Sequence, residues 1–167
     1  MKDYTLTPRE SELFWAKVEK TETCWNWTRS LSKNGGYGQY FTGSGPSKVV
    51  YMAHRLAYSL LVGPIPAGAQ LDHICHNRTC VNPEHLRPVD HKQNAENHQG
   101  ATKNSKSGVR GVYWHERARK WHGQVRHNGV RYYAGLHVNL EDAEAATVAL
   151  RNKLFTHNEI DRDRVAA

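Results

Sequence analysis

The sequence lacks an apolar run of the roughly 18 residues that a membrane-spanning helix needs, and its start, MKDYTLTPRESELF, lacks the apolar core of a signal peptide. We therefore expect an intracellular protein that is not secreted and has no membrane partner. Cysteine is also scarce. Three cysteines cannot all pair within one chain, and intracellular proteins seldom keep structural disulfides, so metal ligation is the leading role for these thiols.

Acidic residues are in the minority, with 16 Asp and Glu against 23 Lys and Arg, and the net charge is +7. Charge alone would suit either a polyanion partner or a solvated surface. The distribution favours nucleic acid, because the stretch 103–131 holds eight basic residues and a single acid, Glu116. Basic and aromatic side chains alternate there, as in many nucleic-acid-binding surfaces, and the aromatic ones are Tyr113, Trp114 and Trp121.

The 167 residues allow one ordinary domain or two small ones. A stretch rich in Gly, Ser, Asn and Lys over 99–108 predicts a linker between a domain at 1–98 and a domain at 109–157, with a tail at 158–167. Hydrophobic periodicity and turn residues predict an α+β fold. The expected helices cover 7–20, 50–62 and 90–97, with a short strand at 71–74. Three strands at 109–114, 120–127 and 130–136 then precede an Ala-rich helix capped by Asn139.

Residues 73–86, HICHNRTCVNPEHL, hold three metal-binding side chains at short intervals: Cys75, Cys80 and His85. Zn²⁺ in a structural site takes four thiolate or imidazole ligands in a tetrahedron, and Cys24 is the natural fourth. We therefore predict a structural zinc that supports a domain too small to depend on its core alone. The alternative is a set of small buried thiols and one surface histidine. Asn77 and Asn82 are expected to fix the loop through backbone hydrogen bonds.

A second constellation begins directly before the loop, at Asp72 and His73, and continues with Asn94 on the next expected helix. Hydrolysis of a phosphodiester needs a neutral base for water and a cation that stabilises charge on the phosphoryl group. We predict His73 as the base, with Asp72 and Asn94 as oxygen ligands of Mg²⁺ or a similar divalent cation. Arg55 is a candidate for contacting the scissile phosphate or stabilising the leaving group, and the alternative is an ordinary arginine on the helix surface.

The pattern D-H-x-C-x-x-x-x-C-x-N-P-x-H-L resembles the ββα-metal (His-Me finger) motif of HNH endonucleases, in the zinc-bearing kind related to His-Cys box homing endonucleases. T-C-W-N-W-T, G-Y-G-Q-Y, A-H-R-L-A-Y and G-P-I-P resemble small HNH proteins of phages, so the similarity covers most of 10–98. It implies that His73 is the general base, Asn94 the catalytic metal ligand and the Cys₃His set the zinc site. HNH nicking enzymes add the acid beside the histidine as a metal ligand, which would be Asp72, whereas His-Cys box enzymes rely chiefly on the asparagine.

Residues 108–155 resemble the ethylene-response-factor (Apetala-type) DNA-binding domain through R-G-V-Y-W, K-W-H-G-Q-V-R, R-Y-Y-A-G-L and E-D-A-E-A-A. In that family a three-stranded sheet lies in the major groove of DNA. The resemblance implies DNA contacts by Arg110, Trp114, Lys120, Trp121, Arg126 and Arg131. Alternatively, one or both tryptophans belong to the core. The sequence departs from the family where Arg or Trp is usual, at Tyr113, His115 and Tyr133.

Together these features predict a phage-type HNH homing endonuclease that hydrolyses double-stranded DNA and is targeted by its C-terminal domain. Tethering two DNA-binding parts raises the effective concentration of each on one duplex. A monomer would nick one strand and a symmetric homodimer could cut both, and the sequence leaves the two open. The main alternative is a zinc-dependent DNA-binding regulator without catalysis, and a nuclease acting on RNA is a further one.

Overall fold

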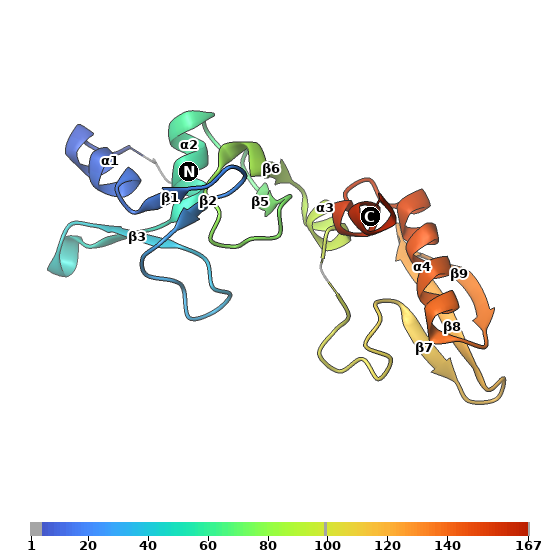
Figure 1. Ribbon diagram of the computed structural model, residues 1–167. Coiled ribbons are helices and arrows are strands. Elements are labelled where there is room, and N and C mark those ends of the chain that lie inside the picture. The colour runs from blue at the N-terminus through green and yellow to red at the C-terminus, as the bar shows by residue number, and fades with distance from the viewer. Residues whose placement is uncertain (1–4, 99, 167) are drawn as a thin grey trace. The chain divides into compact units, whose positions relative to one another are not determined.

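The computed structural model describes residues 5–98 and 100–166 and divides into two compact units, Met1–His91 and Lys92–Ala167. Each unit combines short helices with antiparallel strands, which confirms the predicted α+β class (Figure 1). The division by contacts falls between His91 and Lys92, at the start of a helix, whereas the sequence suggested a boundary at 99–108. Among the described residues, no helix is both long and apolar enough to cross a membrane.

The first unit opens with α1 (Pro8–Trp15), which begins at a capping box formed by Thr7 and Glu10. The expected helix over 7–20 is too long, because α1 closes at Ala16 and the chain continues as β1 (Val18–Lys20). This strand pairs antiparallel with β2 (Trp25–Trp27). The backbone groups of Val18–Lys20 form hydrogen bonds with β2, and these bonds replace those that would continue the helix.

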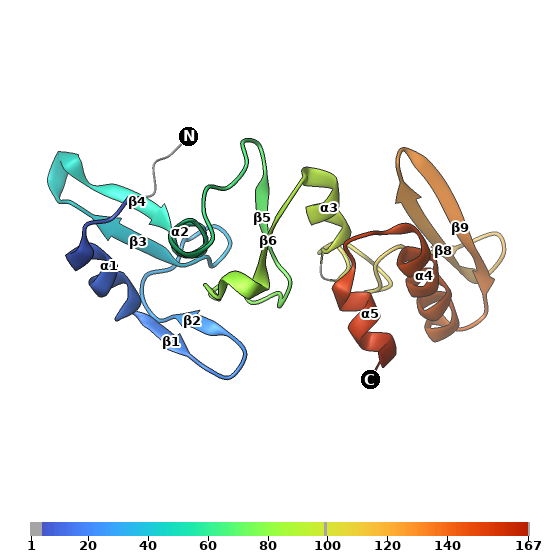
Figure 2. The same cartoon turned by 90° about the horizontal axis from the view of Figure 1, so that it is seen from above.

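A second hairpin joins β3 (Gln39–Thr42) to β4 (Val49–Met52) through the 3₁₀ turn η1 (Gly45–Ser47). The chain then enters α2 (Ala53–Leu61), so the helix expected at 50–62 begins three residues late. The β-branched and aromatic residues Val49, Val50 and Tyr51 favour the strand. In both views α2 stands between this hairpin and the next one (Figure 1 and Figure 2).

Aromatic side chains dominate the core of the first unit. Phe14 stacks on Trp27 at 5.2 Å between ring centroids and meets Tyr40 edge-on at 5.3 Å. Leu56 from α2 and Val81 from the loop after β5 are buried in the same cluster. This cluster therefore ties α1, β2, β3 and α2 to the loop that carries the cysteines.

The last hairpin of the first unit pairs β5 (Gln70–His73) with β6 (Leu86–Val89), and η2 (Pro83–His85) leads into β6. The expected strand at 71–74 is confirmed, to within one residue. β6 is absent from the sequence prediction, since Pro88 argues against a strand. The register sets Asp72 opposite Arg87 and His73 opposite Leu86, which fixes the faces on which the candidate site residues lie.

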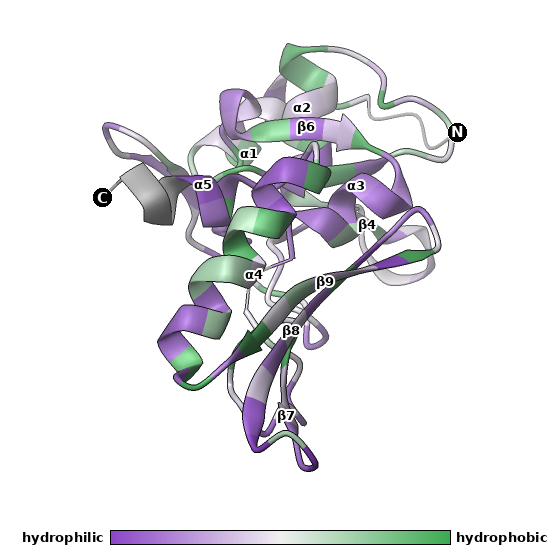
Figure 3. Ribbon diagram, turned by 90° about the vertical axis from the view of Figure 1, so that its right-hand side faces the viewer, coloured by the Kyte–Doolittle hydropathy of each residue, from purple (hydrophilic) through white to green (hydrophobic). Residues whose placement is uncertain are grey.

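The second unit contains the C-terminal end of α3 (His91–Glu96), then β7 (Val112–His115), β8 (Lys120–His127), β9 (Val130–His137), α4 (Leu140–Leu154) and α5 (Glu159–Ala166). The strands form one antiparallel sheet in the order β7-β8-β9. One face of the sheet carries α4, as Figure 3 shows, which confirms the predicted three strands packed on one helix. The region expected to be a tail contains α5.

The close approach of α4 to the sheet depends on a glycine. A Cβ at Gly123 would collide with Thr147 Oγ1 on α4 and with Ala134 Cβ on β9. Val112 and Val125 on the sheet are buried with Ala143 on α4 around this point. The opposite face of the sheet is therefore open for other contacts.

Candidate metal centre and nuclease site

The ligand atoms of Cys24, Cys75, Cys80 and His85 lie within 4.8 Å of one another. His85 Nδ1 lies 3.6 Å from the Sγ atoms of both Cys24 and Cys80. A tetrahedral zinc with bonds of about 2.3 Å to sulfur and about 2.0–2.1 Å to nitrogen separates such ligands by about 3.6 Å. The structure thus brings the four predicted ligands together with a spacing and a donor chemistry that fit structural zinc.

Backbone bonds between β2 and the loop after β5 hold this cluster. Trp27 N donates to Thr79 O, Val81 N donates to Trp25 O, and Cys24 precedes β2 directly. Asn77 Oδ1 accepts from the Thr79 amide, and Asn82 Oδ1 accepts from the Glu84 amide. The expectation that the two asparagines fix the loop is therefore confirmed.

The protonation of the thiols follows from their proximity. A hydrogen bond from Cys75 lowers the pKa of the Cys80 thiol to about 4, and the same bond raises the pKa of Cys75. The contact between the two sulfurs thus favours the thiolate form of Cys80 over that of Cys75. A bound cation favours the thiolate form of every cysteine that it contacts.

His73 lies at the end of β5 and is only 6% exposed. Its Nε2 is 3.1 Å from the carbonyl oxygen of Cys80, which can only accept a hydrogen bond. Nε2 therefore carries the ring proton of the neutral imidazole, and Nδ1 keeps the lone pair. Burial lowers the pKa of His73, so the ring is neutral near pH 7 and can accept a proton.

Two aromatic residues that the sequence prediction did not assign surround His73. The ring of His54, on α2, lies 4.8 Å from that of His73, and Tyr37 lies 5.2 Å from His54 and 5.8 Å from His73. Burial lowers the pKa of His54 to about 3, and its buried Nδ1 has no hydrogen-bond partner among the described residues. A sequence signal existed, since His54 shares the buried face of α2 with Ala53 and Ala57.

The other candidate catalytic residues lie on different elements. Asp72 is 8% exposed, and its Oδ2 accepts from Nε and Nη2 of Arg87 at 3.1 and 3.0 Å. This ion pair follows from the β5–β6 register and holds the carboxylate at one orientation. Arg55 follows His54 on α2 and is half-buried. Asn94 is half-buried on α3, within the second unit.

The open face of the C-terminal sheet carries part of the predicted DNA-binding set. Because side chains alternate along a strand, Lys120 and Arg126 point away from the face on which Gly123 meets α4. Arg131 pairs with Arg126 across β8 and β9 and shares that open face, where His122 stacks on Tyr133 at 5.3 Å. Lys120, Arg126 and Arg131 are all exposed. The turn from β7 to β8, which lies next to Lys120, is strongly hydrophilic (Figure 3).

The remaining members of that set have partners within the unit. Trp114 and Trp121 lie on the α4 side of the sheet and pack edge-to-face at 5.1 Å between ring centroids. Arg110 donates hydrogen bonds to the carbonyl oxygens of Ala95, Glu96 and His98. Trp121 is half-buried and Trp114 is 39% exposed, so the two tryptophans pack on each other while Trp114 keeps an exposed surface. Arg110 has its hydrogen-bond acceptors at the end of α3.

Residues 51–96, from the end of β4 to the end of α3, match the family model described as HNH endonuclease. The matched residues include both His73 and Asn94.

Curated relatives are phage proteins. The uncharacterized gene 5.3 protein of Enterobacteria phage T3 is 45% identical over 56 residues, which are 32% of this chain and 55% of that protein. Protein 2.8 of Escherichia phage T7 is 39% identical over 72 residues, 43% of this chain and 46% of the relative. Protein 7.7 of the same phage is 36% identical over 75 residues, 45% of this chain and 54% of the relative. This chain spans about half the length of each relative. No solved structure matches.

Proposed function

We propose that the protein is a metal-dependent HNH endonuclease of the homing type, which hydrolyses phosphodiester bonds of double-stranded DNA. One observation carries the proposal: His73 is buried, neutral, and tied through Nε2 to the backbone of the cysteine cluster. A regulator that only needed zinc would not require such a histidine. The HNH family match over residues 51–96 and the basic charge of the chain support the same substrate.

His73 Nδ1 takes the proton from the attacking water, because Nε2 is held by the Cys80 carbonyl. Asp72 and Asn94 offer carboxylate and amide oxygens, the hard donors that suit Mg²⁺. Such a cation, when bound, stabilises charge on the phosphoryl group and on the leaving 3′-oxygen. Arg55 is assigned to the scissile phosphate. The products are then 5′-phosphate and 3′-hydroxyl ends.

The C-terminal sheet is assigned to targeting. Lys120, Arg126 and Arg131 give its open face a basic surface, with His122 and Tyr133 stacked among them. Arginine can read guanine with two hydrogen bonds, while lysine mainly positions the protein on phosphates. The resemblance to the ethylene-response-factor domain supports this assignment.

Supercoiled plasmid DNA tests the activity. The zinc-loaded full chain with Mg²⁺ should convert it to open circles, or to linear DNA if a homodimer cuts both strands, and EDTA should prevent the reaction. Mapping of the ends should give 5′-phosphates. Intact plasmid at protein concentrations that saturate duplex DNA would favour the regulator without catalysis, and preferential cleavage of RNA would favour the RNA-acting alternative.

If the open face of the C-terminal sheet binds DNA, removing its arginines should change how duplex affinity depends on salt. Arg126→Ala combined with Arg131→Ala should weaken duplex binding and should reduce the slope of log K against log salt by about 0.9 for every phosphate that the variant no longer neutralises. Fluorescence anisotropy at several salt concentrations measures both quantities. Lys153→Ala, which removes an exposed cation from α4, is the matched control. An unchanged slope in the double variant, or an equal weakening in the control, would contradict the assignment.

A further inference from the structure

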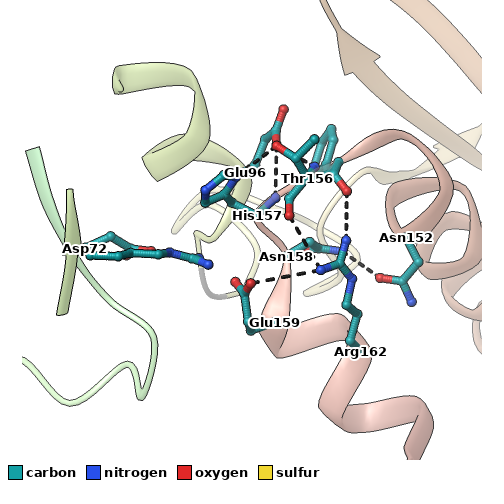
Figure 4. A network of polar contacts seen from close by, with 10 residues as sticks. Asp72, Glu96, Asn152, Thr156, His157, Asn158, Glu159 and Arg162 are labelled. Atoms are coloured by element: carbon teal, nitrogen blue, oxygen red, sulfur yellow. Dashed lines mark hydrogen bonds and ion pairs between the residues drawn. The ribbon is translucent and has the colours of Figure 1, made fainter. Parts of the chain in front are cut away.

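The last residue of α3 is a carboxylate buried inside the C-terminal unit. Glu96 is 3% exposed, and its Oε2 accepts hydrogen bonds from the amide and hydroxyl of Thr156 at 2.9 and 3.2 Å and from the His157 amide at 3.3 Å (Figure 4). Its Oε1 lies 3.3 Å from Lys92 Nζ and 3.4 Å from His127 Nδ1. Burying a carboxylate is costly unless it is paired. These contacts make Glu96 a specific link between α3 and the segment after α4.

Arg110 strengthens the same link from the other side. Its guanidinium donates to the carbonyl oxygens of Ala95, Glu96 and His98, which lie at and beyond the end of α3, and it packs over the ring of Phe155. Carbonyls at a helix C-terminus lack partners within the helix, and a cation there is favourable. Arg151 in turn donates to the Arg110 carbonyl. The end of α3 is therefore built into the C-terminal unit.

A helix of six residues is not stable on its own in water, so its geometry depends on what it is attached to. Asn94 lies within this helix, two residues before Glu96 and one before Ala95. The contacts of Glu96 and Arg110 therefore help to fix the backbone at Asn94.

We propose that Glu96 is a positioning residue for Asn94, and that the C-terminal unit thereby takes part in cleavage as well as in targeting. This inference rests on the proposed function, because it gives Asn94 the role of a metal ligand. The family match ends at Glu96, so the helix that completes the HNH region is the helix that the C-terminal unit holds. Removing the carboxylate leaves the amides of Thr156 and His157 without this acceptor and loosens the end of α3, which then depends on the Arg110 hydrogen bonds.

The test compares four forms of the full chain: wild type, Glu96→Ala, Glu96→Gln and Val125→Ala. Glu96→Ala should lower kcat for plasmid nicking and raise the Mg²⁺ concentration for half-maximal rate, each by about tenfold, as substitutions behind a metal ligand do. Its affinity for duplex DNA should stay within about twofold, since the basic face is unaltered. Glu96→Gln keeps an acceptor oxygen for the two amides and should recover most of the rate.

Val125→Ala is the matched control, because it opens a cavity in the core of the same unit and leaves the hydrogen-bonding groups of Glu96 and Arg110 in place. It should keep the wild-type Mg²⁺ dependence at temperatures where it is folded. Amide hydrogen exchange measured without Mg²⁺ shows whether Glu96 holds α3, and it does not depend on activity. The α3 amides should lose protection in Glu96→Ala and keep it in Val125→Ala.

Unchanged exchange and unchanged Mg²⁺ dependence in Glu96→Ala would overturn the positioning role, as would equal changes in Val125→Ala. An inactive wild type would instead refute the proposed function. If the wild type is active and Asn94→Ala nicks normally, the proposed function stands, but the metal-ligand role of Asn94 is refuted and the positioning role of Glu96 with it. The exchange result then still decides whether Glu96 anchors α3.

Discussion

Replacement of His73 by alanine should lower the rate of plasmid nicking by about 10²–10⁴-fold, the contribution of a positioned general base. The physical reason is that Nδ1 holds the lone pair that accepts the water proton, while Nε2 is tied to the Cys80 carbonyl. Nicking rates at saturating DNA and Mg²⁺ measure the effect. Duplex affinity and zinc content should remain at their wild-type values.

His73→Gln separates chemistry from packing, because its amide can still donate to the Cys80 carbonyl but has no basic nitrogen. It should be as inactive as His73→Ala. His98→Ala, which removes an exposed histidine side chain, should cleave like the wild type. Activity retained in His73→Gln would remove the proton-transfer role from this residue.

The second large effect concerns zinc. Cys75→Ser should release the metal and unfold the first unit, because zinc binding is worth about 10–16 kcal/mol in small metal-dependent domains. Whole domains are stable by only about 5–15 kcal/mol, so the core around Phe14 and Trp27 cannot compensate for that loss. Metal analysis and the fluorescence of Trp15, Trp25 and Trp27 report the two changes. Chelation of the wild type should have the same effect, and added zinc should reverse it.

A histidine in the same loop but outside the cluster supplies the control. His76→Asn suits the positive φ of 56° at this position and should retain zinc, whereas His85→Ala should lose it. Full retention of structure after complete removal of zinc would contradict the structural role of the metal. Zinc loss in both histidine variants would contradict the ligand assignment.

Sequence reasoning predicted the features that depend on local patterns. The helix that begins after Asn139, the strands at 120–127 and 130–136 and the spacing of the loop cysteines each depend on residues close in sequence. The ends of elements were less predictable, because strand pairing competes with helix propensity. β6 was missed since its stability comes from pairing with β5 and overrides the unfavourable Pro88.

Features that depend on distant partners could not be predicted. Arg110 looks like any basic residue in a basic stretch, but its acceptors at Ala95, Glu96 and His98 lie 12–15 positions away. Glu96 likewise finds Thr156 and His157 60 and 61 positions along the chain. Only the folded structure shows that the charged groups of Arg110 and Glu96 form hydrogen bonds inside the C-terminal unit.

Cys80 belongs to two sites at once, since its sulfur lies in the metal cluster and its carbonyl oxygen orients the His73 ring. An oxidant that converted this thiolate to a sulfinate would distort both at a single residue. Under the proposed function, such a change at Cys80 would stop cleavage and leave the basic surface of the C-terminal sheet able to bind DNA.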